Sequence, residues 1–125
     1  MTATTKDFGS LFEQLRAIMA RHSDGMDLLH DLSDHYYLNT KHVRRDGYVL
    51  MFGAVQIRAR YVSYHLMPLY QASELLDGVS VPLRRRMQGK SCFNFTRYDQ
   101  DLADELGNLT EKAAEIARSQ RFLTG

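Results

Sequence analysis

The chain has little cysteine and no long apolar run, and both absences restrict what it can be. A single cysteine, Cys92, excludes an internal disulfide framework and the four-cysteine class of zinc site. No stretch approaches the roughly 18 consecutive apolar residues of a membrane-spanning helix. The amino terminus, MTATTKDFGSLF, also lacks the basic start and apolar run of a signal peptide. These absences predict a soluble protein of a reducing compartment, the cytoplasm.

The chain also has no large excess of positive or of negative charge. The chain has 16 Lys and Arg against 15 Asp and Glu, a formal net charge of +1. No whole-molecule field therefore attracts nucleic acid or anionic lipid, and such a partner would require a local patch. We expect no membrane partner, and nucleic acid is disfavoured. The length, the ordinary composition and the absence of repeats or of a Pro-, Gly- or Ser-rich linker predict one domain, residues 1–125.

Apolar residues at helical spacing predict a helix at each end of the chain. The first should run from about Asp7 to His22 and end near Gly25. The second follows Asp99, an expected N-cap, and continues to about residue 123. Their apolar stripes comprise Phe8, Leu11, Phe12, Leu15, Ile18 and Met19 in the first helix and Leu102, Leu106, Leu109, Ala113, Ile116 and Ala117 in the second. We expect both stripes to pack in one core.

Between the helices, alternating and β-branched residues predict strands near 36–43, 48–57, 61–67 and 91–97. Only the three residues RAR separate the second and third strands, so these should be antiparallel neighbours. Short helical pieces fill 72–89, with Ser73 and Ser80 as expected caps. The sequence therefore predicts an α+β fold: a mainly antiparallel sheet of about four strands with amphipathic N- and C-terminal helices, in the order α-β-β-β-α-β-α.

The segments MFGAVQIRARYVSYHLMPLY and ELLDGVSVPLRRRMQGKSCFNF, with the closing helix, resemble the YdhG-like family of small intracellular domains of unknown function. The resemblance spans roughly residue 51 to the C-terminus. It implies helices packed on an antiparallel sheet, and the iron-chaperone label of some members suggests iron as a cargo. It carries over no catalytic residues.

One face of the third predicted strand is a candidate ligand-binding site. If residues 61–67 are extended, the more apolar face with Tyr64 meets the helices and the other face is covered incompletely. His65 would line a partly hydrated cleft whose expected ligand-binding residues are Tyr61, Ser63, His65, Met67, Cys92 and Asn94. The alternative is a half-exposed sheet in which His65 is simply hydrogen-bonded. An enzyme using His65, alone or with Cys92, is a weaker reading, and we assign no catalytic residue.

The segment DGMDLLHDLSDH is a candidate metal site. Asp27, His30, Asp31 and Asp34 would share one face if the segment were helical. Oxygen and imidazole ligands suit iron or manganese better than structural zinc. A polar, solvent-facing side of a short helix explains the same pattern.

The segment PLRRRMQGK is a candidate anion-binding site, formed by Arg84, Arg85, Arg86 and Lys90. The alternative is that these cations simply favour the end of a short helix, where the helix dipole is negative. MQGKS lacks the first glycine of a phosphate-binding P-loop.

These patterns favour a non-enzymatic binding module for a small molecule or a protein partner. An iron or metal carrier using residues 24–35 is the second hypothesis, and an enzyme is the third. No feature of the sequence requires a cofactor, and a homodimer is left open.

Overall fold

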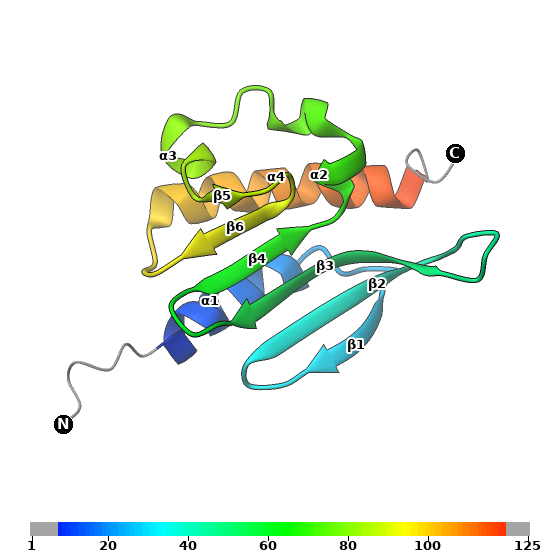
Figure 1. Ribbon diagram of the computed structural model, residues 1–125, viewed down its shortest axis with the longest axis horizontal. Helices are drawn as coiled ribbons and strands as arrows, with labels where there is room; N and C mark the ends of the chain where they lie inside the picture. The colour runs from blue at the N-terminus through cyan, green and yellow to red at the C-terminus, as the bar shows by residue number, and fades with distance from the viewer. Residues whose placement is uncertain (1–7, 120–125) are drawn as a thin grey trace.

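The structure is a computed structural model that describes residues 8–119 of the chain. It confirms an α+β fold on an antiparallel sheet (Figure 1). The strands are β1 (Asp27–Asp31), β2 (His35–Val43), β3 (Val49–Ile57), β4 (Val62–Leu66), β5 (Met87–Gln88) and β6 (Cys92–Phe95). The helices are α1 (Phe8–Ala20), α2 (Pro68–Gln71), the 3-10 helix η1 (Ser73–Leu76), α3 (Val81–Arg84) and α4 (Gln100–Ser119).

The sheet has six strands in the order β1-β2-β3-β4-β6-β5, where the sequence predicted about four. The two unpredicted strands, β1 and β5, are the two edges. All five residues of β1 are exposed, so the strand has no alternation of buried and exposed side chains to reveal it. β5 has only two residues, too few for a periodic pattern.

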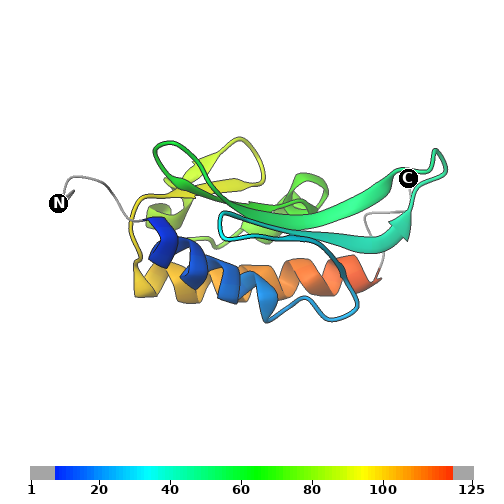
Figure 2. The same cartoon turned by 90° about the horizontal axis from the view of Figure 1, so that it is seen from below.

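The molecule has two layers. α1 and α4 lie beside each other on one face of the sheet, and no described helix lies on the other face (Figure 2). The segment with α2, η1 and α3 joins β4 to β5 and packs against α4. We call the face without helices the open face. No helix among residues 8–119 has the length and apolar character needed to cross a lipid bilayer.

Alternation along the strands separates the two faces. In β4, Val62, Tyr64 and Leu66 are fully buried, whereas Ser63 and His65 between them are only partly buried. The buried set joins one core with residues of both long helices, among them Leu11, Leu15, Ile18, Leu106 and Leu109. The predicted common core of the two terminal helices is therefore confirmed.

A β-bulge in β3 determines which of its side chains reach the open face. Leu38 pairs with Gly53 but Asn39 pairs with Met51, so Phe52 is the extra residue. The bulge lets Met51 share the open face with Ala54, while Phe52 is fully buried in the core.

The helix boundaries agree with most of the expected caps. The Asp99 carboxylate accepts a hydrogen bond from the Leu102 N–H at 3.2 Å, and the Ser80 hydroxyl accepts one from the Leu83 N–H at 3.3 Å. The Ser73 cap is wrong, because Ser73 is the first residue of η1 and Ala72 occupies the cap position. The first helix ends at Ala20, and Gly25 beyond it has the expected positive φ of 79°. The expected start at Asp7 and the stretch after Ser119 lie outside the described residues.

Candidate functional site

Two rows of open-face residues cross four neighbouring strands. In the first row, each residue pairs with the next across the ladder, in the order Tyr37, Ala54, His65 and Cys92. In the second row the order is His35, Gln56, Ser63 and Asn94. The rows bring together strands β2, β3, β4 and β6, which span residues 35–95 of the sequence.

The sheet forms the floor of a hollow of ≈ 530 Å³ on the open face, and the side chains of these rows line it. The hollow is completed by Met51, Arg58, Tyr61 and Gln88. Ala54 has the smallest side chain of the first row and lies between the larger Tyr37 and His65. Rings and apolar atoms alternate with amide, hydroxyl and imidazole groups, the mixture that small-molecule sites use for burial and orientation.

His65 lies in the wall of this hollow and is half-buried. Its Nε2 shares a hydrogen bond of 2.8 Å with the hydroxyl of the buried Ser91. Burial lowers the pKa of the His65 imidazole below its ordinary value, because the charged form loses hydration. The ring is therefore a neutral, oriented polar group at neutral pH.

Cys92 is directly opposite His65 on β6 and is also partly buried. Burial raises the pKa of the Cys92 thiol, and the positive charge of Arg58 opposes that rise. The net direction favours the neutral thiol, whereas nucleophilic attack requires the thiolate.

A cluster of three rings extends the open face toward β1. His30 and His35 are stacked, with ring centroids 4.9 Å apart, and each meets the Tyr37 ring edge-on. Burial lowers the pKa of His35, and a positive charge on His30 would lower it further, while Asp34 opposes both effects. His35 and Tyr37 were not predicted as site residues, although two residues so spaced along a strand lie on one face.

The structure brings together most of the predicted ligand-binding residues. Tyr61, Ser63, His65, Cys92 and Asn94 all line the hollow. Met67 does not, because β4 ends at Leu66 and Met67 has the helical dihedrals φ −59° and ψ −37° that begin α2. Its N–H donates a hydrogen bond to the Phe52 carbonyl instead. That these residues bind a ligand remains a prediction.

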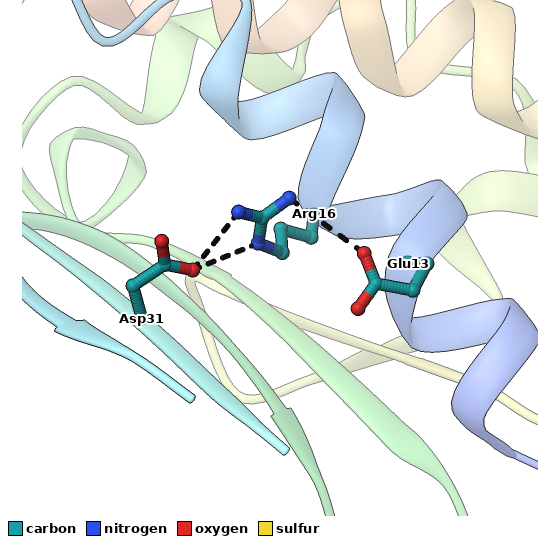
Figure 3. A network of polar contacts seen from close by, with 3 residues as sticks. All are labelled: Glu13, Arg16 and Asp31. Atoms are coloured by element: carbon teal, nitrogen blue, oxygen red, sulfur yellow. Dashed lines mark hydrogen bonds and ion pairs between the residues drawn. The ribbon is translucent and has the colours of Figure 1, made fainter. Parts of the chain in front are cut away.

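The predicted metal ligands lie on and beside β1, a strand and not the helix that would have aligned them. Asp31 accepts hydrogen bonds from Nε and Nη2 of Arg16 at 3.0 and 2.9 Å, and Glu13 lies 3.6 Å from the same guanidinium (Figure 3). Asp27 pairs with Lys41. Within residues 8–119, no three His, Cys, Asp or Glu side chains are arranged to hold a metal ion. The geometry gives the metal prediction no support.

The predicted anion-binding residues make separate contacts. Arg84 donates from Nη2 to the Leu76 carbonyl at 2.7 Å, and the Lys90 ammonium lies 5.5 Å from the centroid of the Tyr70 ring. Arg85 is exposed and Arg86 is partly buried. None of the four lines the hollow on the open face.

Two other hollows are smaller. One of ≈ 190 Å³ lies beside His42 and Arg118, and one of ≈ 230 Å³ lies between α1 and α4. In the first, Arg118 already donates to the His22 carbonyl, and His42 Nε2 is 3.2 Å from the Ala117 carbonyl oxygen. The open-face hollow is the strongest candidate site of the three.

Comparisons of the chain with models of known protein families, with curated proteins and with solved structures find no match. The resemblance to the YdhG-like family therefore stays a prediction, and what the protein does is inferred from its own residues.

Proposed function

We propose that the protein is a small cytoplasmic binding module without catalytic activity, which holds a small organic molecule in the open-face hollow around His65. The observation that carries the proposal is the hollow itself. Its volume of ≈ 530 Å³ falls within the range of about 300 to 1,000 Å³ typical of ligand sites. Its floor is built from four adjacent hydrogen-bonded strands, so the site is formed before a ligand arrives.

The chemistry of the walls supports the same proposal. The Tyr37, Tyr61 and His65 rings provide flat surface for an apolar body. Gln56, Asn94 and Ser63 provide donors and acceptors at its margin. Asn94 is oriented by a 2.7 Å hydrogen bond to the Gln88 side chain, so part of this polar margin is already ordered.

The test is a substitution that fills part of the hollow with a larger side chain. Ala54→Leu places a larger apolar side chain in the lining of the hollow, beside His65, and removes no polar group. Ala54 is buried but lies outside the core cluster that packs under the helices, so we expect the fold to persist. Isotope-labelled protein is titrated with a set of small aromatic and aliphatic fragments, and amide chemical shifts are followed by NMR. Fragments should shift the amides of Ala54, Ser63 and Asn94 in the unmodified chain and should bind at least tenfold more weakly to the variant, about 1.4 kcal/mol.

The matched control is Ala59→Leu, the same change at an exposed residue that does not line the hollow. It should leave fragment binding unchanged. Equal binding to Ala54→Leu and the unmodified chain, or shifts confined to the His42 hollow, would contradict the proposal. A dimer formed through the open face would also contradict it, and would be seen as a concentration-dependent mass in sedimentation equilibrium that Ala54→Leu reduces.

A further inference from the structure

We infer that the ligand of the open-face hollow is an organic anion, a flat body with one carboxylate or phosphate group that lies against Arg58. This inference rests on the proposed function and assigns to that site its class of ligand. Its basis is the distribution of charge around the hollow.

The charged and polar groups that line the hollow favour an anionic ligand. Its only ionised lining residue at neutral pH is Arg58, and neither Asp nor Glu is among the lining residues that the structure describes. The remaining polar groups are amides, hydroxyls, a thiol and the imidazoles of His35 and His65. A cationic ligand would meet no compensating carboxylate here, whereas an anion would meet a guanidinium.

Arg58 forms no ion pair with an acidic side chain, a property it shares with most basic side chains that the structure describes. Arg16, Lys41 and Arg44 are each within ion-pair distance of an aspartate. Across residues 8–119, no carboxylate lies within 4.0 Å of the Arg58 guanidinium. Its Nη1 donates to the Gln56 side-chain oxygen at 3.2 Å, and the remaining guanidinium donors are available to a ligand.

The position of Arg58 directs this charge into the hollow. It follows β3 in the turn to β4, where its N–H donates to the Tyr61 carbonyl at 2.8 Å. The hydrogen bond to Gln56 connects the guanidinium with the second row of open-face residues. The charge also reaches β6, since Arg58 lowers the pKa of Cys92 against the larger opposing effect of burial.

The floor beside Arg58 suits a flat body. Ala54 leaves space between the Tyr37 and His65 side chains, and the Tyr61 ring lines the hollow near the turn. A planar ring over Ala54, with its anionic group toward the β3–β4 turn, would occupy this space and contact the Arg58 guanidinium. An anion without an apolar body would use only the guanidinium.

The experiment compares four probes that share one ring: benzoate, phenyl phosphate, benzamide and benzylammonium. Each is titrated into the full chain at neutral pH and followed by amide chemical shifts at Ala54, Ser63 and Asn94. We expect benzoate or phenyl phosphate to bind at least about fivefold more tightly than benzamide, and benzylammonium to bind most weakly. The two anions distinguish a carboxylate from a phosphate ligand.

Arg58→Gln keeps a polar side chain on an exposed turn and removes the charge. It should weaken the preferred anion about fivefold and leave benzamide unchanged. The control is Arg60→Gln, the same charge change two residues away at an exposed position that does not line the hollow. It should alter anion binding less than twofold, which excludes an effect of net charge alone.

The outcomes separate the two proposals. If the probes bind in the hollow with no preference for the anions, the anion inference is wrong and the proposed binding function is unaffected. The same holds if Arg58→Gln and Arg60→Gln weaken anion binding equally. Absence of hollow shifts with all four probes at millimolar concentration, and with the wider fragment set, overturns both.

Discussion

At the scale of single residues, His65 joins the fold to the candidate site. Its backbone belongs to the central ladder, and its ring faces the hollow with Nε2 hydrogen-bonded to Ser91. Alternation along 61–67 was enough to predict which face His65 occupies. Its partner could not be predicted, because Ser91 becomes a neighbour only through the pairing of β4 with β6. The place of Arg58 at the hollow could not be predicted either, because it depends on which strands pair and in which register.

The His65 ring should titrate below the ordinary histidine pKa of about 6.5, because burial destabilises its charged form. An NMR pH titration of the ring carbon-bound protons measures this directly. The control is the same protein unfolded in concentrated urea, where the pKa should return to about 6.5. A folded-state pKa equal to or above the unfolded one would show that the ring is hydrated and not held in the wall of the hollow.

At the scale of elements, β3 approaches α1 closely at Gly53. A Cβ added at Gly53 would lie 2.6 Å from the His65 carbonyl oxygen and 2.8 Å from Met19 Cε of α1. The strand itself was predictable from its β-branched and aromatic residues. The bulge at Phe52 was not, because two consecutive apolar residues fit either face of an alternating pattern. Edge strand β1 was missed for a different reason: its stability comes from pairing and from contacts such as Arg16–Asp31, not from burial.

Gly53→Ala should lower the free energy of unfolding by about 1 to 3 kcal/mol, because the carbonyl oxygen it meets is backbone and cannot move aside. Gly107→Ala in α4 is the matched control. Its new Cβ would contact only Ile18 Cγ2, at 3.9 Å, and alanine favours the helix by about 0.5 to 1 kcal/mol. Urea unfolding curves should therefore move in opposite directions for the two variants. A stabilising Gly53→Ala would contradict the close approach of α1 and β3.

At the scale of the whole molecule, the two faces of the sheet differ in what covers them. α1 and α4 cover one face (Figure 2), and the other face carries the hollow. The two amphipathic helices and the more apolar side of residues 61–67 were sufficient to predict this division. The depth and lining of the hollow depend on strand order and register, which a single sequence does not determine.

The protein should become less stable as the pH falls below about 6.5. Burial lowers the folded-state pKa of His22, His35 and His65, so the unfolded chain binds more protons than the folded one between the folded and unfolded pKa values. The free energy of unfolding therefore rises as the pH increases from the folded to the unfolded pKa values, and it falls when the pH is lowered through the same range. Chemical unfolding at a series of pH values measures the slope. Replacing all three histidines with glutamine should flatten the curve, and an unchanged slope would mean that other groups cause the loss.

The position of α4 has a consequence for biosynthesis. The helix-facing side of the sheet and the apolar stripe of α1 are completed only by residues 102–117, which a ribosome adds after every strand has been made. Until then the nascent chain exposes an uncovered apolar surface, the kind that chaperones bind and that promotes aggregation. A ribosome stalled before residue 100 would therefore hold a chain with all six strands synthesised and no stable domain.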